Sequence, residues 1–159
     1  GAVTVPSGTT QAVWAGSSYA PNLTVFATPC GGNFLGRDCL VSWNASVRIN
    51  TVGDGTSNTI MFAERYIQPS TLFNLWAYPS NYYWPYNGYF VAVGNAVRLP
   101  QVGAPASAAS WFRTNTAHPS SINVLLMDGS VRGVSGSVSP KTWHDAHTAN
   151  GGEVLGADW

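Results

Sequence analysis

The chain has 159 residues, of which 9% are charged and 13% aromatic, and its formal net charge is zero. Because a neutral surface cannot attract a polyanion over a distance, this composition disfavours nucleic-acid binding. Weak mutual repulsion promotes association, so the composition favours self-assembly over the alternative of a polar domain that stays monomeric.

Residues 1–28 contain short apolar runs of the β type, with no helical period. The run Ala2-Val3-Thr4-Val5 precedes Pro6 and has no obvious hairpin partner beside it. We therefore predict an extended N-terminal arm over residues 1–16. Such an arm could add itself to an exposed sheet edge of another copy, with Ala2, Val3 and Val5 in the contact. The alternative is an edge strand of its own domain, or a frayed terminus.

Further along the chain, the pattern predicts strands at Leu40–Trp43 and Val47–Ile49, followed by a turn at Gly53-Asp54-Gly55. Thr59–Tyr66 is predicted to be a central strand. A strand is also expected over Val91–Val97, followed by a Pro/Ala/Ser-rich loop over Leu99–Ser110. Residues 17–159 are thus expected to form a single domain.

The segment between these strands is rich in aromatic residues: Trp76, Tyr78, Tyr82, Tyr83, Trp84, Tyr86, Tyr89 and Phe90. These rings could pack in the core of the domain, or they could contact a neighbouring subunit. If they contact a neighbouring subunit, we expect the contact to be made by Tyr82, Tyr83, Trp84 and Tyr86. A third interpretation is a platform for sugar rings made by Tyr82, Trp84 and Tyr86.

The C-terminal part has the clearest local signals. Asn123–Met127 and Ser130–Val134 flank Asp128-Gly129, which predicts a tight β-hairpin with a type I′ turn. One helix is expected after it, with Ser139 as N-cap and Pro140 in the first helical position. Asn150-Gly151 stands where the C-cap of that helix is expected.

Two segments carry a family resemblance. His118 is followed by nine residues and Asp128-Gly129, an H-x9-DG motif, and Asp54–Glu64 reads DGTSNTIMFAE, with Gly55 and Asn58 at matching positions. The tail and this stretch resemble pilin-like (pseudopilin or prepilin-type) secreted proteins of planctomycete-type bacteria, a domain of unknown function. The resemblance implies an envelope or surface protein. It implies no established chemistry, and the N-terminal apolar helix usual in such pilins is missing from this sequence.

Cys30 and Cys39 lie nine positions apart. In the secreted context that the resemblance implies, we predict a disulfide between them, which would contribute about 2–3 kcal/mol. A zinc site is the weaker alternative, because no suitably spaced histidines accompany the two thiols.

The histidines are the first candidates for chemistry. His118 could act as a metal ligand or general base with Asp128 or Asp54, or its ring could hold a loop through a hydrogen bond to backbone or to a carboxylate. His144 and His147 share a helix face but leave a zinc site short of ligands. We therefore predict no metal and no cofactor.

The acidic residues are few. Glu64 with Glu153 or Asp128 could serve a glycosidase. We instead expect Glu64 to pair with Arg65, Arg48 or Arg132, and Asp54 and Asp128 to be turn residues. The sequence contains no G-x-S-x-G elbow and no phosphate-binding glycine loop. We therefore expect no enzymatic activity.

Two further features concern modification and membranes. Asn22 and Asn44 fit the N-x-[ST] acceptor pattern, so both are possible glycosylation sites. There is no apolar stretch of 18 residues, so we expect any membrane attachment to use a segment outside this chain.

We predict a mainly β fold, an antiparallel sandwich-like sheet domain with one short C-terminal helix and long loops. The predicted function is that of a non-enzymatic structural subunit, extracellular or on the cell surface, which binds its own copies in a filament or surface assembly. N-terminal strand donation would be one such contact. The alternative is a secreted carbohydrate-binding module that uses the aromatic platform.

Overall fold

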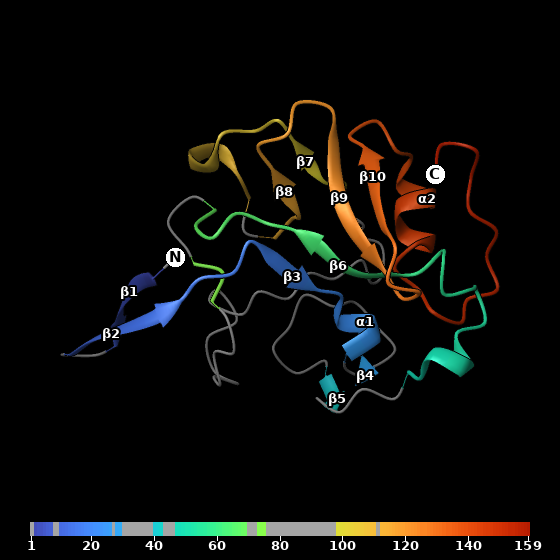
Figure 1. Cartoon of the computed structure of the whole chain (residues 1–159), viewed down its shortest axis with the longest axis horizontal. Coiled ribbons are helices and arrows are strands. Elements are labelled where there is room, and N and C mark those ends of the chain that lie inside the picture. The colour runs from blue at the N-terminus through green and yellow to red at the C-terminus, as the bar shows by residue number, and fades with distance from the viewer. Residues whose placement is uncertain are drawn as a thin grey trace.

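The computed structural model describes residues 2–7, 10–26, 28–29, 40–42, 47–69, 73–75, 98–110 and 112–159. This part of the chain is mainly β, with two short α-helices, α1 (Leu23–Phe26) and α2 (Pro140–Asp145) (Figure 1). The predicted antiparallel β fold with a short C-terminal helix is confirmed. None of the helices in the described ranges is long and apolar enough to cross a membrane.

A four-stranded antiparallel sheet forms the centre of the molecule, in the order β10-β9-β6-β3 (Figure 1). Its strands are β3 (Tyr19–Pro21), β6 (Ile60–Glu64), β9 (Ser121–Leu126) and β10 (Val131–Ser135). The strand predicted over Thr59–Tyr66 is thus an interior strand, as expected, although it ends at Glu64. β6 pairs with β9 about sixty residues later in the chain, with a register irregularity between Ile60 and Phe62.

One face of this sheet forms the hydrophobic core. Side chains alternate between the two faces of a strand, and in β9 it is Ile122, Val124 and Leu126 that are buried. Helix α2 covers this face, and its Trp143 is 1% exposed and donates from Nε1 to the carbonyl of Arg98 at 3.2 Å. The rest of the core cluster is Ala20, Ile60, Ala63, Val134, Val138 and Ala146. Each large apolar side chain buried here stabilises the fold by about 1.5–3 kcal/mol.

Helix α2 begins as predicted and ends earlier. The Ser139 hydroxyl accepts from the backbone N–H of Thr142 at 3.2 Å, and Pro140 holds the first position. The predicted C-cap at Asn150-Gly151 is wrong, because the helix ends at Asp145 with Ala146 as C-cap. The carbonyl of Ala146 instead accepts from the N–H of Ile60 at 2.8 Å. This contact with β6 takes the place of another helical turn.

The N-terminal segment forms a hairpin, so the prediction that residues 2–5 have no hairpin partner is wrong. β1 (Ala2–Ser7) pairs antiparallel with β2 (Thr10–Ala15), and Ser7 lies opposite Thr10. The hairpin projects from the body of the molecule near β3 (Figure 1).

Short pairings complete the described part. β4 (Thr28–Pro29) pairs antiparallel with β5 (Leu40–Ser42), and β7 (Gln101–Val102) pairs parallel with β8 (Asn115–Thr116). The predicted strand at Val47–Ile49 is wrong, since Ile49–Thr51 forms a 3-10 helix. The predicted loop at Leu99–Ser110 contains β7 and a 3-10 helix, Ala106–Ala108. The strand predicted over Val91–Val97 lies outside the described residues.

Candidate functional site

The sheet brings the two motif segments into contact. The N–H of Asp128 donates to the carbonyl of Thr56 at 3.1 Å, and the N–H of Met127 donates to the carbonyl of Thr59 at 3.0 Å. The turn after β9 therefore rests on the loop before β6. We call these residues, together with His118 and its contacts, the motif junction.

The Asp-Gly turn differs in type from the prediction. The N–H of Gly129 donates to the carbonyl of Leu126 at 3.0 Å, the N–H of Leu126 donates to the carbonyl of Ser130 at 2.9 Å, and Gly129 has φ +85°. These bonds define a three-residue connection, Met127 to Gly129, with glycine in the left-handed position. The hairpin is confirmed and the two-residue type I′ turn is wrong, because the contacts of Met127 and Asp128 with the β6 loop favour the longer connection.

Both aspartates of the motifs hold turns. Asp128 Oδ1 accepts from the Ser130 hydroxyl at 2.6 Å and from its N–H at 2.8 Å. These side-chain and backbone hydrogen bonds lower the pKa of Asp128. The carboxylate of Asp54 accepts from the N–H groups of Gly151 and Gly152 at 3.0 and 2.6 Å. Asp54 therefore ties the chain after α2 to the loop before β6.

Gly55 and Asn58 complete the loop before β6. Gly55 has φ +94°, a conformation that residues with a Cβ rarely adopt. Asn58 Nδ2 donates to the carbonyl of Asp54 at 2.9 Å. These two residues shape the loop on which the Asp128 turn rests.

At the other end of β6, Glu64 binds His118 and Asn123. Glu64 Oε2 accepts from the N–H of Asn123 at 2.9 Å, and Oε1 accepts from Asn123 Nδ2 at 2.9 Å and lies 3.2 Å from His118 Nε2. The ring of His118 thus binds a carboxylate, one of the interpretations open from the sequence. Asp54 and Asp128, the other acids considered for His118, bind elsewhere.

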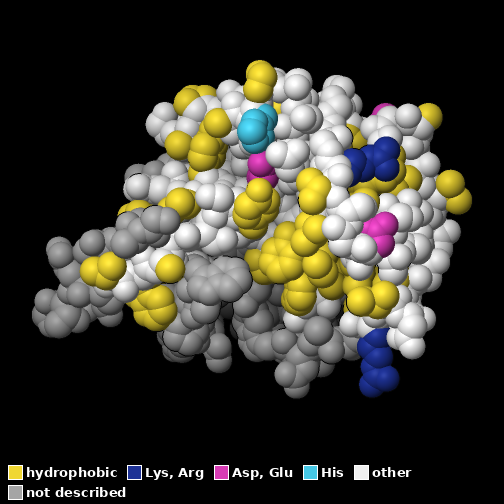
Figure 2. Space-filling model, viewed as in Figure 1, with side chains coloured by type: hydrophobic (Ala, Val, Ile, Leu, Met, Phe, Trp, Pro, Cys, Tyr) yellow, Lys and Arg dark blue, Asp and Glu magenta, His cyan; other side chains and the backbone are white. Residues whose placement is uncertain are grey.

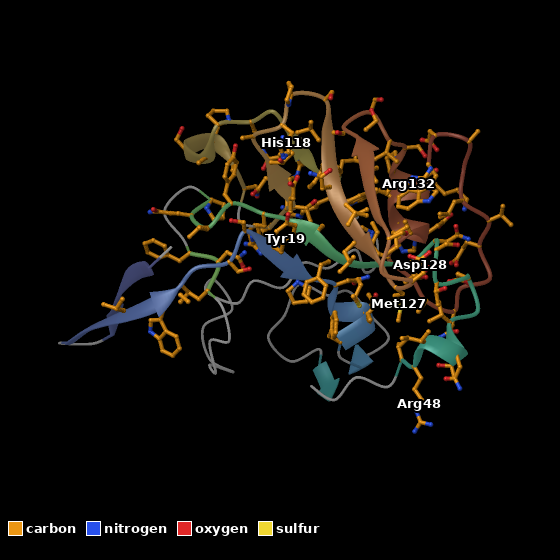
Figure 3. The ribbon with its side chains drawn as sticks, in the orientation of Figure 1. Tyr19, Arg48, His118, Met127, Asp128 and Arg132 are labelled. Carbon is orange, nitrogen blue, oxygen red and sulfur yellow. The ribbon has the colours of Figure 1, made fainter. Side chains whose placement is uncertain are left out.

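The predicted arginine partners of Glu64 are wrong. The Arg132 guanidinium donates to the carbonyl of Trp159 at 2.7 Å and lies 4.9 Å from the centre of its ring. Arg65 is 3% exposed, and burial lowers its pKa to about 10. Arg48 lies at the far end of the molecule from His118 (Figure 3). Asn123 takes the place of an arginine because the register puts it beside Glu64.

The electrostatics of Glu64 favour a structural role over a catalytic one. Burial raises its pKa, but the hydrogen bonds from Asn123 and Thr116 and the charge of His118 outweigh burial and leave the pKa below its ordinary value. A general base works best with a pKa near the operating pH. Both oxygens of this carboxylate already accept hydrogen bonds from the protein. The group fixes the segment after β8 against β6.

The other two histidines contact neighbouring residues in and after α2. His144 Nδ1 lies 3.3 Å from Asp145 Oδ1. His147 is fully buried, its Nδ1 lies 2.5 Å from the carbonyl of Trp143, and burial lowers its pKa to about 4. Within the described ranges, no three His, Cys, Asp or Glu side chains are grouped so as to hold a metal ion.

Asn22 is a structural residue and not an accessible glycosylation site. Its side chain is fully buried, and Nδ2 donates to the carbonyls of Ile60 at 2.8 Å and His147 at 2.9 Å. Asn22, one of the two possible glycosylation sites, is therefore inaccessible in the folded chain. Asn44, the pair Cys30 and Cys39, and the aromatic residues between Trp76 and Phe90 lie outside the described residues.

Two contacts near the C-terminus were not predicted. The carboxylate of Asp158 accepts from the Ser139 N–H and the Thr142 hydroxyl, each at 2.6 Å, and these bonds lower its pKa to about 2. Trp159 stacks with Arg132 and packs against the core. The sequence offered one weak signal, an aspartate and a tryptophan after a glycine-rich stretch.

A shallow groove of about 500 Å³ lies elsewhere, between β7 and the neighbouring ends of β9 and β10. Its lining is mostly small and polar, with Gln101, Arg113, Ser120, Ser135 and Ser137. None of the site residues predicted from the sequence lines it.

Comparison with known proteins identifies a family. The model of the family described as Protein of unknown function (DUF1559) matches residues 2–141. The chain belongs to the DUF1559 family. The match includes the hairpin β1–β2, both motif segments and the start of α2. For this DUF1559 protein, no match was found among curated proteins or among solved structures.

Proposed function

We propose that this DUF1559 protein is a non-enzymatic structural subunit that associates with its own copies in an extracellular, pilin-like filament or surface layer. The proposal includes secretion by a bacterium. The observation that carries it is a sheet face with exposed apolar side chains on a nearly uncharged molecule.

The face of the central sheet opposite α2 supports this proposal. The register aligns Pro21, Phe62, Leu125 and Val131 across the four strands, and Tyr19 lies beside Glu64 on the same face. We call these five apolar residues the open face. Tyr19 is 51% exposed and Val131 is 70% exposed, while Phe62 and Leu125 are half-buried. Figure 2 shows hydrophobic side chains gathered over β3, β6 and α1, below His118.

Such a face is a recognised sign of an interaction surface. A partner that is another copy of the chain fits the absence of net charge, because neutral molecules repel each other weakly. The hydrogen bonding of Glu64 also favours a structural interpretation of the motif junction.

The test is the size of the protein as its concentration rises, by sedimentation and by negative-stain electron microscopy. We expect assemblies that grow with concentration. Tyr19→Lys should weaken them at least tenfold, because it places a charge on the open face, while the fold is kept. Val154→Lys is the matched control, since Val154 is 89% exposed and lies outside the open face.

A protein that stays monomeric at high concentration would contradict the proposal. If that monomer is also retained on a polysaccharide column, the carbohydrate-binding alternative is favoured. Equal effects of Tyr19→Lys and Val154→Lys would show that the open face is not a contact between copies.

A further inference from the structure

The outer edge of β10 carries backbone groups that are available for a further strand. In an antiparallel pair, residues alternate between facing the partner strand and facing away from it. The bonds from the Leu126 N–H to the Ser130 carbonyl and from the Gly136 N–H to the Ser120 carbonyl place the even-numbered residues of β10 toward β9. The N–H groups of Val131, Gly133 and Ser135 therefore point away from the sheet. These three residues are exposed, and their N–H groups have no acceptor among the described residues.

This edge lacks the features that usually protect a free edge. Natural proteins block such edges with charged side chains, prolines or bulges. Arg132 is the one charged residue of β10, and its guanidinium is held by Trp159. Gly133, in the middle of the strand, has no side chain to keep another backbone away.

β1 also has an outer edge that is available for pairing. It pairs with β2 alone in a two-stranded sheet, so its second edge has no strand partner among the described residues. Ser7 and Thr10 close the hairpin, and the alternation then places Ala2, Thr4 and Pro6 on the outer edge. Pro6 has no N–H to leave unpaired. The first charged residue of the chain is Arg37, so no charge within the hairpin opposes pairing.

The two free edges lie at opposite ends of the molecule. β10 is the last strand of the sheet at one side, and the hairpin β1–β2 projects beyond β3 at the other (Figure 1). We propose that the outer edge of β1 pairs with the outer edge of β10 in the next copy, so that subunits join head to tail. Contacts of this kind do not close on themselves and generate filaments. This inference rests on the proposed function and names its contact.

Pairing of β10 with β10 around a two-fold axis is the competing arrangement. Centred on Gly133, it would place Arg132 of each copy diagonally across from the other on one face, where like charges are unfavourable. It would also end at a dimer. Pairing of β10 with the uncharged strand β1 brings no like charges together and does not end at a dimer.

Amide hydrogen exchange of the wild-type protein, monomer against assembly, tests the contact directly. The N–H groups of Val131, Gly133 and Ser135 should exchange fast in the monomer and at least a hundredfold slower in the assembly, together with those of Ala2 and Thr4. Arg132 and Val134, which face β9, should be protected in both states. Assemblies in which Val131, Gly133 and Ser135 still exchange fast would overturn the β1–β10 contact and leave the proposed function standing.

A matched pair of variants gives a second test. Gly133→Pro removes the outward N–H and should abolish filaments, whereas Gly133→Ala adds a Cβ at the same place and keeps the N–H. Either Cβ would meet the Ser121 hydroxyl at 3.3 Å, a contact that this small side chain can relieve. Deletion of residues 1–5 should also abolish filaments and leave the core folded. Dimers that survive this deletion would establish β10–β10 pairing in place of β1–β10, and a wild-type protein without any assembly would overturn both proposals.

Discussion

Asn22 connects three parts of the molecule through one buried side chain. Nδ2 donates to the first residue of β6 and to the segment after α2, while Oδ1 accepts from the N–H of Thr24 at 3.1 Å at the start of α1. A buried amide with its donors and acceptor in use costs little, but its removal leaves a buried acceptor without its donor.

Asn22→Ala should therefore lower the free energy of unfolding by on the order of 2 kcal/mol, because the Ile60 carbonyl loses its side-chain donor, whereas the His147 carbonyl keeps the Thr24 hydroxyl. Urea denaturation followed by circular dichroism measures this. Asn50→Ala is the control, because Asn50 is exposed in the 3-10 helix, and it should change stability by less than about 0.5 kcal/mol. A loss below about 1 kcal/mol for Asn22→Ala would contradict the connecting role.

The sequence predicted which individual residues have structural roles more reliably than it predicted their hydrogen-bond partners. His118, Glu64, Asp54 and Asp128 were all selected from motifs, and each has a defined contact. The pairing of Glu64 with His118 and Asn123 depends on the register between β6 and β9, which the local sequence does not specify. Asn22 fits the N-x-[ST] pattern, but this local pattern does not reveal that the side chain is buried.

Helix α2 is held at its N-terminus by the last turn of the described chain. It has six residues, too few to be stable alone. Ser139 caps it as predicted from the Ser-Pro pair, and Asp158 binds both Ser139 and Thr142. The helix covers the core face of the sheet, so this cap also secures Trp143.

The low pKa of Asp158 predicts an acid-dependent loss of stability. Hydrogen bonds from Thr142 and Ser139 lower it from 3.8 to about 2. The charged form is favoured in the folded state, so the contribution is complete above about pH 4 and is lost as the pH falls toward 2. Asp158→Asn should remove this part of the pH dependence of unfolding, and carboxyl NMR titration should follow the same group.

Thr142→Val is the companion variant, because it deletes one donor and should raise the pKa of Asp158 in the same titration. Thr51→Val, at an exposed position, should leave the pKa of Asp158 unchanged. An Asp158 that titrates near 3.8 in the wild-type protein would show that the cap does not form in solution.

Elements were predictable where the signal is local. The hairpin β9–β10 and the start of α2 follow from a turn pair and a cap. The end of α2, the three-residue turn and the hairpin β1–β2 were wrong or missed, since each depends on contacts with a distant segment or on a loop without a strong turn signal. Tertiary contacts override local propensity in such places.

Scarcity of charge is the feature of the whole molecule that bears most on the proposed assembly. With 9% charged residues and no net charge, electrostatic repulsion and attraction between copies are both small. Apolar contact and backbone pairing would then supply the free energy of association. Assembly is expected to depend little on ionic strength.

Raising NaCl from about 0.1 M to about 1 M shortens the screening length from about 10 Å to about 3 Å. The critical concentration for assembly, measured by light scattering, should stay within about twofold or fall. A charge-driven assembly would dissolve under the same change. Dissolution at about 1 M NaCl would therefore contradict an interface made by the open face and strand edges.

The pairing of β6 with β9 has a consequence for the order in which the chain can fold. β6 pairs with β3, which lies about forty residues earlier in the chain, and with β9, which lies about sixty residues later. Helix α2, which covers the core face, comes after both. Contacts so distant in sequence make folding slow. During synthesis, residues 1–120 can therefore form only part of the fold before β9 is made. Such partly folded chains are prone to aggregation until β9, β10 and α2 have been made.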